Sequence, residues 1–334
     1  MVNVGIYFDL RNPPGWRQDP ARLHAFTLEM CEEAEHLGAH SVWLTEHHLF
    51  DDDYLTQPLT FAAAVAARTR RVRIGTALVV APLHHPVEIA EQAALVDLIS
   101  AGRLELGLGA GYREPEYRLF GVTGERRYGR TDDCVREVRR LWAEGGLTPR
   151  PVQHPVPLWL GYQGPQGARR AGLLGTGLLS LDPDLVEPYR KGLADGGHDA
   201  GSARMAGGVQ GWVSEDPDAD WPLVSRHVVA QFDSYRRHLV QGTGQPTPRS
   251  VDPSRLRGRD PRGPLDHFWH ETPAGMAARI RRRIGDAPVE TVFLWASLAG
   301  MPEDLVAGNI RTICTRLAPL LRADERENNE GNRP

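Results

Sequence analysis

The sequence predicts an α/β protein, a (β/α)₈ TIM barrel with an insertion between its seventh and eighth strands. Eight short apolar runs of strand character recur along the 334 residues, and amphipathic helical patterns lie between them. This alternation implies parallel strands joined by right-handed crossovers. The chain is also longer than the roughly 250 residues that such a barrel typically needs.

The predicted strands are mostly continuous apolar runs, as expected of strands that are buried on both faces. They cover Val4–Phe8, Ser41–Thr45, Val72–Val80, Leu104–Leu108, Leu158–Leu160, Gly177–Leu181, Gly207–Val213 and Thr291–Trp295. Apolar residues at helical spacing predict helices over Leu23–Leu37, Leu59–Ala67, Val87–Leu98, Thr131–Trp142, Leu185–Leu193, Val224–Leu239 and Leu305–Leu321.

An open, doubly wound sheet is the main rival architecture. In its dinucleotide-binding form, that fold places a G-x-G-x-x-G turn after the first strand. Here Phe8 leads instead into a loop over Arg11–Pro20 that is rich in proline, glycine and arginine. Eight strand–helix units therefore favour closure into a barrel.

Residues 1–322 are predicted to form a single domain. The segment 241–272 is an insertion that contains five prolines and several glycines and arginines. Loops of this length commonly act as lids or binding loops, and we expect this one to be a lid. The aromatic stretch 267–270 indicates partial order within it. Residues 323–334 are predicted to form a polar tail.

The composition excludes several kinds of chemistry. Lys191 is the one lysine among 39 basic residues, so there is no P-loop lysine and little scope for lysine nucleophiles. Cys31, Cys134 and Cys314 are too few and too far apart for a disulfide framework or a cysteine-rich zinc site. A net charge of -4 gives no reason to expect nucleic acid or a membrane as partner. Because neither a signal peptide nor a long apolar span is evident, we expect a cytoplasmic protein.

Candidate catalytic residues follow from the barrel, because active sites lie at the carboxyl ends of its strands. The second strand ends in Glu46, His47 and His48, and the third leads to His84 and His85. The first group consists either of solvated side chains at a helix start or of two ligands of a metal ion. No third ligand has a convincing spacing to them, so no metal site is predicted. His84 and His85 are either site residues or simply the end of a loop before Pro86.

Glycines cluster at the ends of the fourth and fifth predicted strands. Gly107, Gly109 and Gly111 are either positions of close packing or a bed for a ligand. Gly161 and Gly164 belong either to a plain turn or to a phosphate site, because free N–H groups and a helix dipole attract anions. The placement of these features at successive strand ends favours a binding site.

Together these segments resemble the bacterial luciferase-like flavin-dependent monooxygenases. The resemblance rests on VWLTEHH (42–48), IGTALVVAPLHHP (74–86), ISAGRLELGLGAGYREPEYRLFGV (99–122), VPLWLGYQGPQGARRAGLLGTG (156–177) and the C-terminal segment 290–322. It extends from residue 2 to about 322 and is weakest over 241–272. The fold of that family is a (β/α)₈ barrel, in agreement with the strand count.

The resemblance also implies roles for individual residues. His47 corresponds to the family's histidine beside flavin and oxygen, Glu46 and His48 shape its surroundings, and His85 corresponds to another histidine near the site. The bond Thr76–Ala77 lies where the family often has a non-proline cis peptide behind the flavin ring. The residues implied in cofactor binding are Thr76, Ala77, Gly109, Ala110, Gly111, Tyr112, Arg130, Gly161, Gln163, Gly164 and Pro165.

The function implied is oxidation of a small organic substrate with reduced FMN and O₂. A separate flavin reductase would supply the FMN, and the enzyme would be a homodimer. Ala110 departs from the pattern of luciferases that place an arginine there for the flavin phosphate, which would leave backbone N–H groups or Arg130 to hold it. This departure leaves an alternative, an oxidoreductase that transfers hydride with 8-hydroxy-5-deazaflavin and without O₂. A third hypothesis is a flavin-binding subunit without catalysis.

Overall fold

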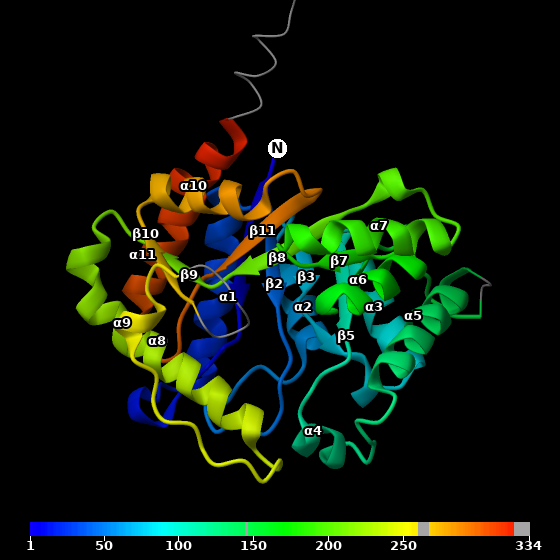
Figure 1. Cartoon of the computed structure of the whole chain (residues 1–334), viewed down its shortest axis with the longest axis horizontal. Coiled ribbons are helices and arrows are strands. Elements are labelled where there is room, and N and C mark those ends of the chain that lie inside the picture. The colour runs from blue at the N-terminus through cyan, green and yellow to red at the C-terminus, as the bar shows by residue number, and fades with distance from the viewer. Residues whose placement is uncertain (144–145, 260–266, 324–334) are drawn as a thin grey trace, which may run out of the picture.

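The computed structural model describes residues 1–143, 146–259 and 267–323. Its main sheet is entirely parallel, in the order β3-β2-β1-β11-β8-β7-β6-β5-β4, and β3 also pairs with β5, which closes the barrel. The predicted (β/α)₈ barrel is therefore confirmed, with helices around it (Figure 1). Its strands are β1 (Asn3–Phe8), β2 (Ser41–Leu44), β3 (Arg73–Thr76), β4 (Val79–Val80), β5 (Leu104–Gly109), β6 (Leu158–Leu160), β7 (Gly177–Leu179), β8 (Met205–Val209) and β11 (Val289–Trp295).

Two predicted strands are each divided in the structure. The run Val72–Val80 becomes β3 and β4, which together fill one place in the barrel because both pair with β5. The run Gly207–Val213 becomes β8, in the barrel, and β9 (Gly211–Val213), which pairs in parallel with β10 (Trp269–Glu271) instead. The aromatic end of the 241–272 insertion is thus an ordered strand beside the barrel.

Most helices begin a few residues before the first apolar residue of the predicted pattern. A proline occupies the first turn of several, where its missing N–H costs nothing, and this extends them towards the N-terminus. The helices are α1 (Pro20–His36), α2 (Pro58–Arg68), α3 (Pro86–Ser100), α4 (Glu114–Leu119), α5 (Arg127–Ala143), α6 (Gly164–Leu173), α7 (Val186–Asp195), α8 (Pro217–Val240), α9 (Pro253–Leu256), α10 (Pro273–Ile284) and α11 (Glu303–Thr312). A search of the described helices finds none that could cross a membrane.

Aromatic rings fill the inside of the barrel. Trp43 stacks on Phe293 with ring centroids 4.6 Å apart and meets Trp159 edge-on at 6.4 Å. Glycines make room for these rings, because a Cβ on Gly75 would lie under 3.0 Å from Trp43 and a Cβ on Gly177 equally close to Trp159. Since the interior is packed, a ligand can bind only at the rim, where the strands end.

Helix α8 and the short helix α4 meet at this rim (Figure 1). Nε of Arg113, the residue before α4, donates to the carbonyl of His238 in α8 at 3.1 Å, and its Nη2 donates to Gln241 at 2.6 Å. The start of the insertion thus lies at the rim, but its role as a lid stays a prediction. Residues 260–266 and the tail from 324 onward lie outside the described residues, and the domain bounds also stay predictions.

Candidate active site

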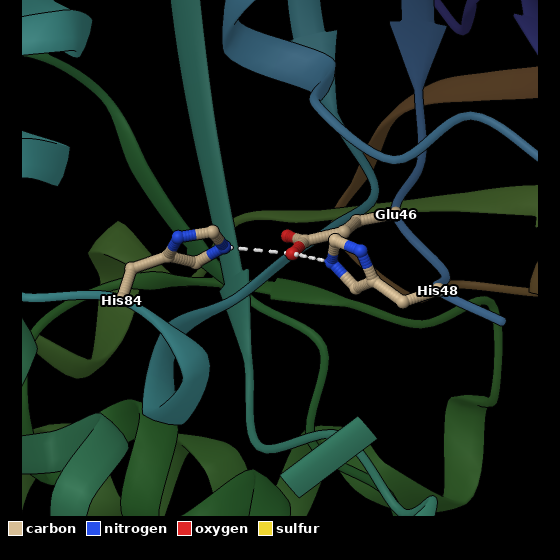
Figure 2. Close-up of side chains that lie close together, drawn as sticks. All are labelled: Glu46, His48 and His84. Atoms are coloured by element: carbon tan, nitrogen blue, oxygen red, sulfur yellow. Dashed lines mark hydrogen bonds and ion pairs between the residues drawn. The ribbon is translucent and has the colours of Figure 1, made fainter. Parts of the chain in front are cut away.

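Glu46 lies buried after β2 and joins two loops. Its Oε1 accepts from Nε2 of His48 at 2.8 Å and from Nε2 of His84 at 2.7 Å, and its Oε2 accepts from the Val80 N–H at 2.8 Å (Figure 2). Burial by itself raises the pKa of this carboxyl, but the hydrogen bonds from the two imidazoles outweigh it and hold the pKa below its ordinary value. Glu46 and His48 are therefore joined by a third side chain, His84, which lies in the loop after β4.

His47 points the other way, towards α4. Its Nδ1 lies 2.9 Å from Oε1 of Glu116, which also accepts from the His48 N–H at 2.9 Å and from Nη1 of Arg113 at 2.7 Å. As an ionised carboxylate only accepts, Nδ1 carries a proton, and the unprotonated Nε2 accepts from the Tyr112 hydroxyl at 3.3 Å. Burial lowers the pKa of His47 below its usual 6.5 despite Glu116, which favours a neutral imidazole at pH 7.

Aromatic side chains surround the His47 ring. Phe50 stacks on it at 4.7 Å, while Tyr54, Tyr112 and Tyr235 meet it edge-on at 4.9, 5.5 and 6.2 Å. Tyr235 belongs to α8, so this helix contributes one of the rings that bury His47. Exclusion of water by such rings strengthens the electrostatic interactions among the groups that they bury.

A buried ionic network connects the end of β1 to α8. Arg11 donates from Nε to Asp9 at 2.9 Å, and from Nη1 to Asp52 at 2.6 Å and to Ser234 at 3.0 Å. Its guanidinium also lies 4.0 Å from the ring centroid of Tyr235. These contacts hold α8 against the rim.

The backbone bends sharply between β3 and β4. The cis peptide is Ala77–Leu78, one bond after the predicted Thr76–Ala77, and this corrects the sequence prediction. The Leu78 side chain lies between Gly109, which ends β5, and Gly161, which follows β6, since a Cβ on either glycine would lie under 3.0 Å from it. Both glycines are therefore close-packing positions around Leu78.

The start of α6 offers unpaired N–H groups. Gln163 at its N-cap makes no side-chain cap, Pro165 follows in the first turn, and Gly164 has φ +70° with open space where a Cβ would stand. Nε of Arg170 and Nε of Arg127 are buried without a hydrogen-bond partner in the described part of the chain, although Arg170 is already ion-paired through Nη2 with Asp132. The helix start therefore offers the N–H donors that a phosphate requires.

The other predicted site residues lie in different settings. Thr76 hydrogen-bonds through Oγ1 to the Gly107 carbonyl at 2.8 Å, and Ala110 is buried with its carbonyl accepting from Tyr117 at 2.7 Å. Gly111 has φ +68°, which favours glycine. His85 is an exposed N-cap of α3, and Arg130 is exposed on α5; neither is brought to His47 by any hydrogen bond or ion pair among the described residues.

Sequence reasoning missed several of these residues. Glu116 lies within the quoted motif 99–122, and its position three residues after Arg113 is the one signal that could have found it. Ser234 and Tyr235 of α8 have no comparable signal in the sequence. The residues that sequence reasoning missed are His84 as a partner of Glu46, and Asp9, Arg11, Asp52, Arg113, Glu116, Ser234 and Tyr235.

Comparison with known families supplies the identity. The sequence matches the family of luciferase-like monooxygenases over residues 3–303, which is most of its length. The chain belongs to this family. The resemblance that the strand-end motifs carry is thereby confirmed.

Relatives within the family differ in cofactor. The oxygenase component of a flavin-dependent trigonelline monooxygenase from Acinetobacter baylyi is 30% identical over 165 residues, or 45% of this chain and 46% of the relative. An F420-dependent glucose-6-phosphate dehydrogenase from Amycolatopsis mediterranei is 30% identical over 183 residues, or 48% of this chain and 55% of the relative. The chain thus spans about half the length of these curated relatives. Members of the family use flavin or F420.

Solved structures of luciferase-like proteins have the same fold. A monooxygenase from Streptomyces bottropensis superposes with a TM-score of 0.75 at 24% identity, covering 95% of this chain and 99% of that one. An F420-dependent secondary alcohol dehydrogenase gives a TM-score of 0.71 at 20% identity and covers 96% and 99%. At these identities the likeness concerns the fold alone.

Proposed function

We propose that this protein is the oxygenase component of a two-component FMN-dependent monooxygenase. The observation that carries the proposal is His47 at the barrel rim, whose Nδ1 is held by Glu116 and whose unprotonated Nε2 lies among aromatic side chains. Reduced FMN, when bound, would supply two electrons to O₂, so that one oxygen atom enters a small organic substrate and the other leaves as water. A separate flavin reductase would regenerate the reduced FMN.

The start of α6 fits the phosphate end of FMN. Gly161 and Gln163 precede the helix, and the N–H groups at Gly164 and beyond have no side-chain cap. The unpartnered Nε of Arg127 suits a dianion, whereas Arg170 would share its charge between the phosphate and Asp132. Ala110 offers no charge, so these groups would take the place of the arginine found in some luciferases, together with the exposed Arg130.

The ring end would lie between Leu78 and His47. We propose that Thr76, Ala77, Gly109 and Gly111 shape this bed through their backbone, as the close glycine contacts support. The hydroxyl of Tyr112 donates to the unprotonated Nε2 of His47 at 3.3 Å.

Within this site, the residues of the chain handle the proton and exclude water. His47 would take up or deliver a proton at Nε2, because Glu116 keeps Nδ1 protonated and fixes the ring. Glu46 holds the loop on which His47 stands. The role of His85 would be indirect, through the start of α3, as its exposed position favours.

Oxygen consumption tests this proposal. With FMNH₂ and a panel of small organic substrates, we expect O₂ uptake that yields an oxygenated product, and His47→Ala should bind FMN as before but lose that coupled turnover. Unchanged turnover in His47→Ala would contradict the role of His47. We also propose a homodimer and a cytoplasmic location, which size-exclusion chromatography and cell fractionation would test.

The F420-dependent relatives support a second candidate function. In that case the protein would transfer hydride to or from 8-hydroxy-5-deazaflavin, and O₂ would not be consumed. Titration with FMN and with the deazaflavin separates the two, because a hydride-transfer enzyme should bind and turn over only the deazaflavin. A flavin-binding subunit without catalysis would bind flavin but turn over neither.

A further inference from the structure

Three side chains from two loops converge on one point beside the proposed active site. Glu46 and His48 belong to the loop after β2, and His84 follows the short 3-10 turn Ala81–Leu83 (Figure 2). Both imidazoles direct Nε2 at Oε1 of Glu46, at 2.8 and 2.7 Å, and the three atoms lie within 4.8 Å of one another. Each is an atom type that binds metal ions.

The Glu46 carboxylate lacks a permanent positive partner. Its side chain is 0% exposed, and its contacts are the two imidazoles and one backbone N–H. Within the described ranges, no arginine or lysine pairs with it. A buried carboxylate is costly unless a positive charge compensates it. That charge must come either from a proton on one imidazole or from a bound cation.

We propose that Glu46, His48 and His84 form a binding site for a divalent transition-metal ion of the Zn²⁺ class. Two imidazole nitrogens and one carboxylate oxygen suit such ions, whereas Mg²⁺ and Ca²⁺ prefer oxygen ligands. Three protein ligands leave a coordination position for water. The His84 side chain is 12% exposed, which gives an ion a path from solvent.

The geometry needs only a small adjustment to take the ion. Ligand atoms about 2.1 Å from a tetrahedral Zn²⁺ stand roughly 3.4 Å apart, so each Nε2 has to retreat from Oε1 by roughly 0.6 Å. His84 and His48 both lie on loops, where such shifts are available. His47 is not one of these ligands, because its Nδ1 is bonded to Glu116 and its Nε2 to the Tyr112 hydroxyl.

The ion would connect the loop after β2 with the end of β4. Glu46 Oε2 already accepts from the Val80 N–H, so the metal would strengthen an existing connection and restrict the loop that carries His47. This proposal does not depend on the identity of the flavin, and metal binding can be measured without turnover.

Zinc titration of the full-length, EDTA-treated protein against a chromophoric chelator tests the site. We expect one Zn²⁺ per wild-type chain, and His84→Ala should weaken binding more than about 100-fold, since loss of an outer-shell partner alone costs about 10–100-fold. The matched control is His85→Ala, which removes the neighbouring exposed imidazole and should bind Zn²⁺ like wild type. Equal binding by His84→Ala and wild type, or no binding by wild type at micromolar Zn²⁺, overturns the proposal.

A second measurement needs no variant and so does not depend on variant folding. X-ray absorption at the zinc edge, on wild-type protein with one equivalent of Zn²⁺, should show scattering from two imidazoles. A first shell with no imidazole, or with more than two, would place the ion elsewhere and refute this assignment.

Discussion

Glu116 is the buried acceptor on which the arrangement of His47 depends, and its replacement gives the sharpest test. Its Oε1 accepts from His47, from the His48 N–H and from Arg113, and its side chain is 1% exposed. Removing one member of a buried ion pair costs about 3–5 kcal/mol. We therefore expect Glu116→Ala to lower the free energy of unfolding by about 3–5 kcal/mol, because the Arg113 guanidinium is left buried without its carboxylate.

Glu116→Gln separates charge from shape. The amide keeps an acceptor oxygen, and Arg113 still donates to the carbonyls of His48 and His238. The free energy of unfolding should therefore fall by only about 1–2 kcal/mol, the contribution of one charge-assisted hydrogen bond. The effect of Glu116→Gln on turnover should be larger. We expect the rate to fall by about 10²–10⁴-fold, because the neutral amide no longer stabilises a proton on His47.

Urea denaturation followed by tryptophan fluorescence and O₂ uptake with FMNH₂ measure the two effects. The control is Glu114→Gln, which makes the same chemical change at an exposed position of the same helix. If Glu116→Gln matches Glu114→Gln in both unfolding and turnover, the reasoning about the His47–Glu116 pair is refuted.

Three further perturbations test other parts of the molecule. Gly75→Ala should lower the free energy of unfolding by about 1–3 kcal/mol in urea, because its methyl group would collide with Trp43, whereas Gly15→Ala, in open space, should not. Burial lowers the pKa of His270 from 6.5 to about 4, so the unfolded chain binds more protons. Stability should therefore fall as pH drops from 6.5 towards 4, by up to about 3 kcal/mol, and His270→Gln should flatten that slope. Gln163→Glu should weaken FMN binding about 5–10-fold in fluorescence titrations, because its carboxylate would repel the phosphate, but should leave riboflavin binding unchanged.

Hydrophobic patterning predicted the barrel well but not every helix. Apolar runs located all eight places in the barrel, because strands buried on both faces must be apolar throughout. The short α4 was not predicted, and neither was α6, whose buried face consists of glycine and alanine rather than large apolar residues. For α10, Met276, Ala277 and Ile280 do lie at helical spacing and could have revealed it. The divided strand Gly207–Val213 shows that continuity of apolar residues does not report where a strand leaves the barrel.

The sequence by itself determined the family, the barrel and the strand ends at which chemistry gathers. These depend on local patterns and on motifs that are contiguous in the chain. Only the tertiary structure decided which side chains meet there. Glu46 reaches His84 across 38 residues, His47 reaches Glu116 across 69, and Tyr54 reaches Tyr235 across 181. Such pairs arise from barrel closure and from the docking of α8 on the rim, and contacts between distant loops leave no periodic trace along the chain.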